Sequence, residues 1–212
     1  MRLHEDPRAP NVRRVRLFIA EKGLDIPSAP VDIVAGDQRS AAFRAINPFG
    51  RVPVLELDDG TYLAESLAIC RYLEALHPDP PLFGGPDPAN AARVEMWNER
   101  VVHYLLYPIF HLFRHTHAAA MGLEPAQIAE WGEMNRDKLH AALDIFETAL
   151  GDGRAWLTGD GYSIADINAL AGIDFMRVCR ERLDAQRWPR LKAWHERMQA
   201  RPAVRATPVV LR

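Results

Sequence analysis

The chain has 212 residues, enough for one large domain or two small ones. Its 26 Lys and Arg against 28 Asp and Glu give a net charge of −2, without the basic excess that a nucleic-acid-binding protein uses to neutralise phosphates. No apolar run approaches the roughly 20 residues that span a bilayer, and the first residues, MRLHED, lack the apolar stretch of a signal peptide. We therefore expect a cytoplasmic protein that binds neither nucleic acid nor membrane.

The first 80 residues alternate short strand patterns with helical ones. Apolar residues recur at helical spacing over residues 11–24, and Gly23 is a typical residue just beyond a helix end. Asp59–Gly60 is a strong turn signal between two alternating runs, which predicts a hairpin. The order βαβαββα indicates a small mixed sheet covered by helices. The expected elements are strands at residues 1–5 and 29–34, helices at 11–24, 40–47 and 66–78, and a hairpin at 51–66.

Beyond a Pro- and Gly-rich stretch near residues 78–88, the sequence pattern is typical of helices. Ser163, with Asp166 three residues later, is close to a capping box in which Asp replaces the usual Glu or Gln. Helices are expected at residues 90–120, at 125–150, from Ser163, and at 187–204 with a break at Pro202. The predicted organisation is an α/β domain at residues 1–80, a linker at 81–89 and an all-helical domain at 90–212.

The two cysteines, Cys70 and Cys179, have neither metal nor redox spacing. Cys70 lies in an apolar helical stretch and is expected to pack as a small hydrophobic residue. The absence of a disulfide framework suits a reducing compartment.

Residues 8–18, RAPNVRRVRLF, begin a helix after a proline-bounded loop. Free N–H groups and the dipole make such a helix start attractive to an anion. The arginines Arg8, Arg13, Arg14 and Arg16 form either a solvated helix face or part of an anion site. The loop contains no Cys, Ser, Thr or Tyr, so it offers no obvious nucleophile.

Two further positions allow two interpretations each. Pro53 lies inside an expected strand, which indicates either an edge strand or a cis Val52–Pro53 bond that turns the main chain toward a ligand. Glu65 and Ser66 begin a helix, where Ser66 either caps the helix or binds a carboxylate while Glu65 binds an ammonium group.

An aromatic stripe follows in the second half of the chain. Its side chains share a helix face in part, so they form either core or the wall of a binding pocket. His111 and His115 are four residues apart, but no carboxylate or Cys completes a ligand set with them and His117, and no metal is expected. The stripe comprises Tyr104, Tyr107, Phe110, His111 and Arg114.

Together these features resemble the glutathione S-transferase superfamily over the whole chain. The resemblance is carried by NPFGRVPVLELDDG, by ESLAICRYL after the hairpin, by the Pro-rich linker, by YSIADI and by ERMQARPAV. It implies a thioredoxin-like α/β domain followed by an all-α domain. It also implies glutathione as co-substrate, no metal, and a homodimer.

The resemblance assigns a role to four residues around the hairpin. Glu65 and Ser66 match the pair that binds the γ-glutamyl amine and carboxylate. Val52, before the matching cis-Pro53, would pair its main chain with the cysteinyl unit of glutathione.

The same resemblance places polar groups at the other end of the tripeptide and at its sulfur. Gln38 and Arg51 would lie around the glycine carboxylate, although related classes often have His in place of Gln38. The Ser or Thr of related loops falls on Ala9, which leaves Asn11 as the residue that could donate to the sulfur. A bacterial subgroup with T-P-N in this loop, the nu-like subgroup, is similar. Asn11 alternatively only caps the helix.

The function implied is that of a glutathione S-transferase in detoxification, which activates the thiol of glutathione for attack on a small electrophile. The alternatives are a glutathione-dependent disulfide reductase, as the nu-like loop suggests, and a glutathione-binding scaffold without catalysis. The electrophile pocket is expected at Ala9, Tyr104, Tyr107, Phe110 and His111.

Overall fold

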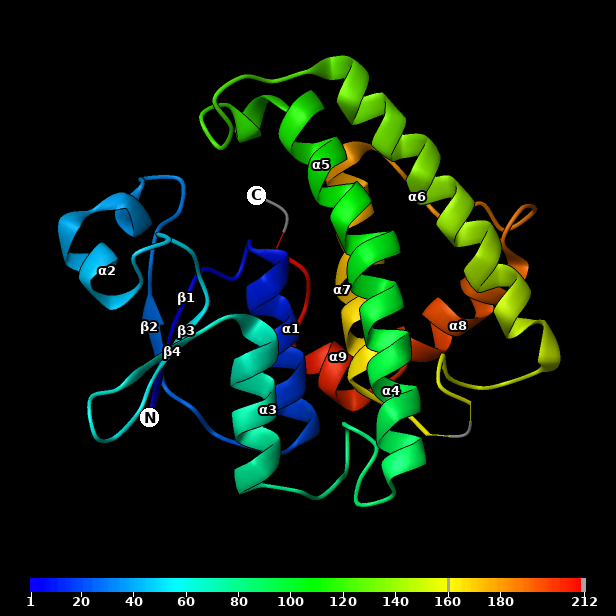
Figure 1. Cartoon of the computed structure of the whole chain (residues 1–212), viewed down its shortest axis with the longest axis horizontal. Coiled ribbons are helices and arrows are strands. Elements are labelled where there is room, and N and C mark those ends of the chain that lie inside the picture. The colour runs from blue at the N-terminus through cyan, green and yellow to red at the C-terminus, as the bar shows by residue number, and fades with distance from the viewer. Residues whose placement is uncertain (160, 211–212) are drawn as a thin grey trace. The chain divides into compact units, whose positions relative to one another are not determined.

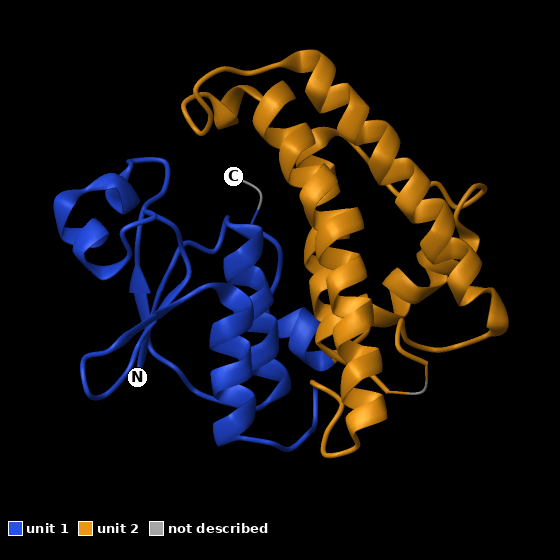
Figure 2. Cartoon of the chain, viewed as in Figure 1, with its two compact units in different colours: residues 1–82, 202–212 blue, residues 83–201 orange. Residues whose placement is uncertain are grey.

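A computed structural model describes residues 1–159 and 161–210 of the chain (Figure 1). The chain forms two compact units, shown in Figure 2: unit 1 comprises Met1–Leu82 and Pro202–Arg212, and unit 2 comprises Phe83–Arg201. This grouping differs from the predicted domain at 90–212, because the segment from Pro202 joins the sheet unit rather than the helical one. None of the described helices is both long and apolar enough to cross a lipid bilayer.

Unit 1 is built around a four-stranded mixed sheet with the strand order β2-β1-β3-β4. Strand β1 is parallel to β2 and antiparallel to β3, which is in turn antiparallel to β4. Helices α1 and α3 pack together on one side of the sheet, and α2 lies on the other (Figure 1). The predicted order βαβαββα is confirmed. The elements are β1 (Arg2–Glu5), α1 (Pro10–Glu21), β2 (Ser28–Pro30), η1 (Asp37–Arg39), α2 (Ala41–Ile46), β3 (Val54–Glu56), β4 (Tyr62–Ala64), α3 (Ser66–Leu76) and α9 (Pro202–Ala206).

Local sequence signals explain most of these boundaries. Helix α1 ends where Gly23 adopts a positive φ of 63°, a conformation that costs glycine little. Gly60, with φ of 82°, closes the predicted hairpin. The strand expected at 29–34 is wrong in its bounds, because β2 ends at Pro30. The Asp32 carboxylate then accepts hydrogen bonds from the N–H groups of residues 34 and 35, which turns the chain out of the sheet.

Both sides of the sheet carry buried apolar residues. Phe43 of α2 packs against Val31 and Val54, and α1 contributes fully buried side chains that include Val15 and Phe18. Cys70 is buried within α3, so its predicted role as a packing residue is confirmed. This packing fixes α1 and α3 as rigid supports for the loops at the end of the sheet.

Unit 2 is helical throughout its regular elements. Every residue of α7 except Phe175 is buried, as befits a central helix that α4 and α5 contact. The helix predicted at 90–120 is in fact interrupted by a π-helical turn, where Pro108 lacks the N–H that a continuous helix needs. The elements are α4 (Pro88–Val101), η2 (Val102–Leu106), α5 (Tyr107–Thr116), η3 (Ala118–Ala120), α6 (Ala129–Ala149), η4 (Leu150–Asp152), α7 (Ile164–Met176), η5 (Arg177–Cys179) and α8 (Pro189–Gln199).

The capping box predicted at the start of α7 is confirmed. The Asp166 carboxylate accepts from the Ser163 N–H at 3.1 Å, and from the N–H of Leu157 and the indole N–H of Trp194 at 3.0 Å each. Burial raises the pKa of Asp166 to about 6, while these donors act in the opposite direction. The start of α7 is thus closed by groups of its own unit.

Candidate functional site

Several predicted site residues meet at one end of the unit 1 sheet. The register pairs His4 of β1 with Val54 of β3, and Val54 with Ala64 of β4. The carboxyl ends of β1 and β4 and the amino end of β3 therefore lie at the same end of the sheet. Three segments adjoin that end: the loop before α1, the Val52–Pro53 segment just before β3, and the Glu65–Ser66 pair just after β4.

The Val52–Pro53 bond is cis, as predicted. The edge-strand alternative is wrong, because β3 lies between β1 and β4 and begins only after Pro53. Within the described chain the main-chain N–H and C=O of Val52 have no hydrogen-bond partner. An extended peptide could pair with this free main-chain edge.

Helix α3 begins with an open set of donors. Its cap residue is Glu65, whose φ is 66° and whose side chain makes no capping hydrogen bond. The first helical bond runs from the Ile69 N–H to the Glu65 carbonyl, so the N–H groups of residues 66–68 lack acceptors among the described atoms. The capping alternative for Ser66 is wrong, since Ser66 is the first residue inside the helix.

The Ser66 hydroxyl has a partner that the sequence did not reveal. Nη1 of Arg14 donates to Oγ of Ser66 at 2.6 Å, and both residues are buried. Burial lowers the pKa of Arg14 to about 10. The solvated-face interpretation is wrong for Arg14 and for its neighbour Arg13, which are each only 6% exposed. Arg14 precedes the fully buried Phe18 by one turn, and this spacing is the signal that marks it as inward-facing.

The start of α1 is similarly uncapped by side chains. Ala9 occupies the cap position, Pro10 is the first helical residue and Asn11 the second. The alternative in which Asn11 caps α1 is wrong, because the cap position carries no side-chain hydrogen bond. The carboxamide of Asn11 is half-buried and bonds to no other described group, and the N–H groups of Asn11 and Val12 also lack acceptors there. Free amide donors thus cluster at this helix start.

Ion pairs hold the loop that leads into α1. Arg8 binds the carboxylate of Asp6 at 2.5 Å and that of Asp32 at 2.6 Å, so its charge is balanced within unit 1. Asp6 is buried and also accepts from the Ile33 N–H. Burial tends to raise the pKa of Asp6, but the hydrogen bonds from Arg8 and Ile33 outweigh it and lower the pKa. Arg8 is consequently a structural cation rather than a free positive charge.

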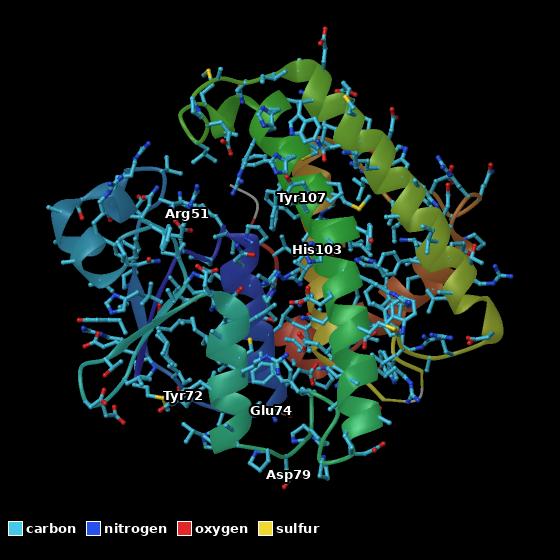
Figure 3. All side chains as sticks on the ribbon, viewed as in Figure 1. Arg51, Tyr72, Glu74, Asp79, His103 and Tyr107 are labelled. Atoms are coloured by element: carbon cyan, nitrogen blue, oxygen red, sulfur yellow. The ribbon has the colours of Figure 1, made fainter. Side chains whose placement is uncertain are left out.

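Gln38 lies in η1 beside the loop that contains Gly50. A Cβ on Gly50, whose φ is 58°, would lie 2.8 Å from the Gln38 carbonyl, so only glycine permits this approach. The Gln38 amide donates to the Ile33 carbonyl at 3.3 Å, while its buried Oε1 lacks a partner. Arg51 is exposed (Figure 3). The roles of Gln38 and Arg51 at a glycine carboxylate remain predictions.

The predicted electrophile residues are divided between the units. Ala9 belongs to unit 1, and the others lie on η2 and α5 of unit 2, where Figure 3 labels Tyr107. Tyr104 and Tyr107 are 62% and 50% exposed, so the core alternative is wrong for them. The rings of Tyr107 and His111 lie 4.2 Å apart, and the Phe110 ring lies 5.8 Å from Phe175. The pocket itself remains a prediction.

The surroundings of His111, Cys70 and Cys179 keep these side chains in their uncharged forms. Trp131 donates its indole N–H to Nδ1 of His111, and burial, with nearby cations, lowers the pKa of His111. Burial raises the pKa of both Cys70 and Cys179 to about 12, which keeps the two thiols protonated at neutral pH. Among the residues that the structure describes, no group of three His, Cys, Asp or Glu side chains is placed to hold a metal.

Comparison with known proteins matches both halves of the chain to one family. Residues 9–76 match the N-terminal domain of glutathione S-transferases and residues 125–197 the C-terminal domain. Glutathione S-transferase 2 of Saccharomyces cerevisiae is 36% identical over 97% of this chain and 88% of its own length. The chain belongs to the glutathione S-transferase superfamily.

Solved structures agree with this assignment. The crystal structure of Gtt2 from Saccharomyces cerevisiae superposes with a TM-score of 0.90 and 34% identity, covering 98% of this chain and 100% of that one. Glutathione S-transferase-I bound with lactoylglutathione has a TM-score of 0.81 and 26% identity, with 97% of each chain covered. The protein is thus a glutathione transferase, an enzyme whose family uses glutathione as co-substrate.

Proposed function

We propose that this transferase binds glutathione along the open end of the unit 1 sheet. Glu65 binds the γ-glutamyl ammonium group, and Ser66 with the free N–H groups of α3 binds the adjacent carboxylate. Val52 pairs its unbonded main chain with the cysteinyl unit. Three sets of main-chain groups without hydrogen-bond partners support the assignment: those at the start of α1, at Val52 and at the start of α3. All three adjoin the same end of the sheet. The glycine carboxylate is then held by Arg51 and Gln38.

The sulfur of glutathione lies at the start of α1 in this proposal. Its thiolate accepts hydrogen bonds from the Asn11 carboxamide and from the free N–H groups there. Lowering a thiol pKa from about 8.5 toward 7 requires roughly 2 kcal/mol. A helix start contributes about 0.3–1 kcal/mol and a hydrogen bond to a charged group about 1.5–3 kcal/mol. These contributions suffice without a hydroxyl, and Arg8 is not needed because Asp6 and Asp32 already balance it.

The thiolate then attacks an electrophilic carbon of a small substrate. A C–S bond forms, and either a leaving group departs with its electron pair or the resulting anion takes up the proton that the thiol released. The side chains of unit 2 proposed to hold the electrophile are Tyr104, Tyr107, Phe110 and His111. The single observation that carries this function is the uncapped start of α1, which offers donors for a thiolate but no nucleophile of its own.

Substitution of Asn11 tests the proposal. Asn11→Ala should raise the thiol pKa of bound glutathione by about one unit and lower kcat at pH 7 about fivefold, with glutathione affinity nearly unchanged. Asn11→Asp places a carboxylate in the first turn, which the helix dipole tolerates but which repels a thiolate. Ultraviolet titration of bound glutathione and a kcat–pH profile measure both variants. An Asp variant with its full rate would contradict a contact between Asn11 and sulfur.

A substrate panel separates conjugation from the alternatives. An aryl halide reports conjugation, a hydroxyethyl disulfide reports reductase activity, and calorimetry with glutathione alone reports binding. Both reactions use the sulfur of glutathione, because burial keeps Cys70 and Cys179 as thiols. Faster turnover of the disulfide would favour the reductase, and heat of binding without either turnover would favour a scaffold.

We also propose that the transferase is a homodimer in the cytoplasm, where thiols stay reduced. The ring of Phe49 is 80% exposed, so it is free to pack against a second copy of the chain. Sedimentation at micromolar concentration should give a dimer that Phe49→Ser weakens. A monomeric parent protein would overturn this part of the proposal.

A further inference from the structure

Two histidines of α5 accept hydrogen bonds from the start of α6. Nδ1 of His115 accepts from the main-chain N–H of Ile128, the cap residue of α6, at 3.1 Å. Nδ1 of His111 accepts from the indole N–H of Trp131 at 3.3 Å. His115 is buried, and the two imidazole rings are stacked with their centroids 5.7 Å apart. Because a main-chain or indole N–H can only donate, both Nδ1 atoms are unprotonated, and each neutral ring carries its proton on Nε2.

A third histidine repeats this arrangement in the connection between the two helices, residues 117–128. Nδ1 of His117 accepts from the N–H of Ala119 at 3.2 Å. The side-chain amide of Gln127 also holds the connection, since it donates to the carbonyls of Arg114 and His117 at 2.8 and 2.9 Å. The contact of Gln127 does not titrate, whereas the three imidazoles provide acceptors that do.

Protonation reverses the chemistry of these acceptors. A protonated imidazole carries N–H groups on both ring nitrogens, so Nδ1 then faces another donor and the hydrogen bond is lost. Two other histidines of unit 2 respond in the opposite way. Nε2 of His103, which Figure 3 labels, lies 3.0 Å from a carboxylate oxygen of Glu99. Nε2 of His195 lies 2.8 Å from one of Asp174, so a protonated ring gains an ion pair at either site.

The charged groups around His111 favour its neutral form. Burial lowers the pKa of His111, and Arg114, His115 and Lys138 act in the same direction, whereas Glu124 acts against them. Arg114 and Glu124 lie 3.4 Å apart as an ion pair. Because the folded pKa is below the ordinary value of 6.5, the stability that His111 contributes is complete above pH 6.5 and is lost as the pH falls toward the folded pKa.

Uncharged groups face the other two rings. From α6, Ile128 donates to His115, and a Cβ on Gly132 would lie 3.3 Å from Cβ of His115, so the helix approaches this residue closely. The His117 ring stacks on Phe113 with centroids 5.2 Å apart. In the described part of the chain neither ring is paired with a carboxylate, so neither gains an ion pair when it is protonated.

We propose that His111, His115 and His117 form an acid-sensitive attachment that releases the α5–α6 connection from the end of α5 under mildly acidic conditions. Release frees the Ile128 N–H and the Trp131 indole, so the first turn of α6 loses these contacts with α5. The buried side chains further along α6 keep the rest of that helix packed. This inference is independent of the proposed glutathione site.

Hydrogen exchange followed by mass spectrometry tests the release in the parent protein. Protection of the peptides that cover residues 117–131, corrected for the intrinsic pH dependence of exchange, should fall about tenfold between about pH 7.5 and about pH 5.5. The indole signal of Trp131 in NMR, assigned by its loss in Trp131→Phe, should shift over the same range. Equal protection at both pH values overturns the proposal.

Substitution by asparagine separates the acceptor from its titration. Asn places Oδ1 close to the position of Nδ1, and this oxygen accepts a hydrogen bond from an N–H in acid as well as at neutral pH. The double variant His111→Asn/His115→Asn should therefore keep most of its protection at the lower pH. His103→Asn is the matched control, and it should lose protection as the parent does. A double variant that loses as much protection as the parent overturns the proposal, because another group such as His140, whose pKa burial also lowers, is then responsible.

If the double variant does not fold, NMR of the imidazole nitrogens in the parent protein decides instead. The loss of protection and the shift of the Trp131 indole should share a midpoint with the Nδ1 signal of His111 or His115. A shared midpoint supports the proposal, and a midpoint that matches neither ring overturns it.

Discussion

The start of α7 and the starts of α1 and α3 show opposite solutions to the same problem. Every helix leaves its first N–H groups without partners inside the helix. In α7 the buried Asp166 and Ser163 satisfy them from within the unit. In α1 and α3 the cap residues, Ala9 and Glu65, contribute no side-chain hydrogen bond.

The difference separates a structural helix start from one that is available to a ligand. Ser40 caps α2 and Asp87 caps α4, as Asp166 closes α7, although the starts of α2 and α4 lie nearer the surface. Of the described helices α1, α2 and α3, α1 and α3 begin without a side-chain cap, and both begin at the end of the sheet where glutathione is proposed to bind. An uncapped start alone does not mark a ligand site, because α6 of unit 2 also begins without a side-chain cap hydrogen bond. In unit 1 it is the position of the uncapped starts at one end of the sheet that makes them candidates for ligand binding.

Removing the cap of α7 should give the largest change in stability. Asp166→Ala leaves the N–H of Ser163, the N–H of Leu157 and the indole of Trp194 without an acceptor in a buried site. We expect the free energy of unfolding to fall by about 4 kcal/mol in urea denaturation, because each orphaned donor costs about 1–3 kcal/mol. Residual folded enzyme should keep its Kd for glutathione. A weakened Kd with intact stability would reverse the distinction between the two kinds of helix start.

Ser66→Ala should give the opposite pattern. Glutathione affinity should fall by about 1.5–3 kcal/mol, the worth of a hydrogen bond to a charged group. The free energy of unfolding should fall by about 1 kcal/mol, because Arg14 loses a partner but α3 loses no cap. Paired calorimetric and denaturation measurements check both numbers. A stability loss larger than the affinity loss would assign Ser66 a structural role.

The loop before α1 should make the open site sensitive to acid. Asp6 has a pKa below its ordinary value of 3.8 in the folded state, where Arg8 and the Ile33 N–H bind its carboxylate. Because the folded pKa is the lower one, this stabilisation is present above pH 4 and is lost as the pH falls through the folded pKa. Asp6→Asn should cost about 1–2 kcal/mol at pH 7 and less at pH 3. Equal losses at both pH values would show that charge is not the cause.

The parts of the fold that local chemistry determines were predictable from the sequence. The turn at Asp59–Gly60 and the capping box at Ser163 each depend on a few adjacent residues. The cis Val52–Pro53 bond followed from the family resemblance, because the local sequence also allowed an edge strand. The bounds of β2 were harder to predict, because the sequence after Pro30 continues in an apolar pattern typical of a strand. The turn at Asp32 ends the strand there instead. Pro108 likewise interrupts a helical pattern that otherwise continues past it.

For the candidate site, the sequence suggested residues but not the partners of their side chains. Glu65, Ser66 and Val52 come from recognisable motifs. The bond from Arg14 to Ser66 joins residues 52 positions apart, which no local pattern encodes. The charge of Arg14 favoured a solvated helix face, and only its spacing to Phe18 pointed inward.

Asn11→Ala gives the smallest expected change in stability and tests the open start of α1 most directly. If Asn11 capped the helix, its loss would cost about 1 kcal/mol. Asn11 is instead the second helical residue and makes no capping bond, and Ala has the higher helix propensity by a few tenths of a kcal/mol. The variant should therefore be as stable as the parent or slightly more stable in urea denaturation, while its kcat at pH 7 falls. A polar residue that lowers stability yet raises the rate is retained for its contact with a ligand. A loss of 1 kcal/mol with an unchanged rate would assign Asn11 a purely structural role and leave thiol activation to the main-chain N–H groups.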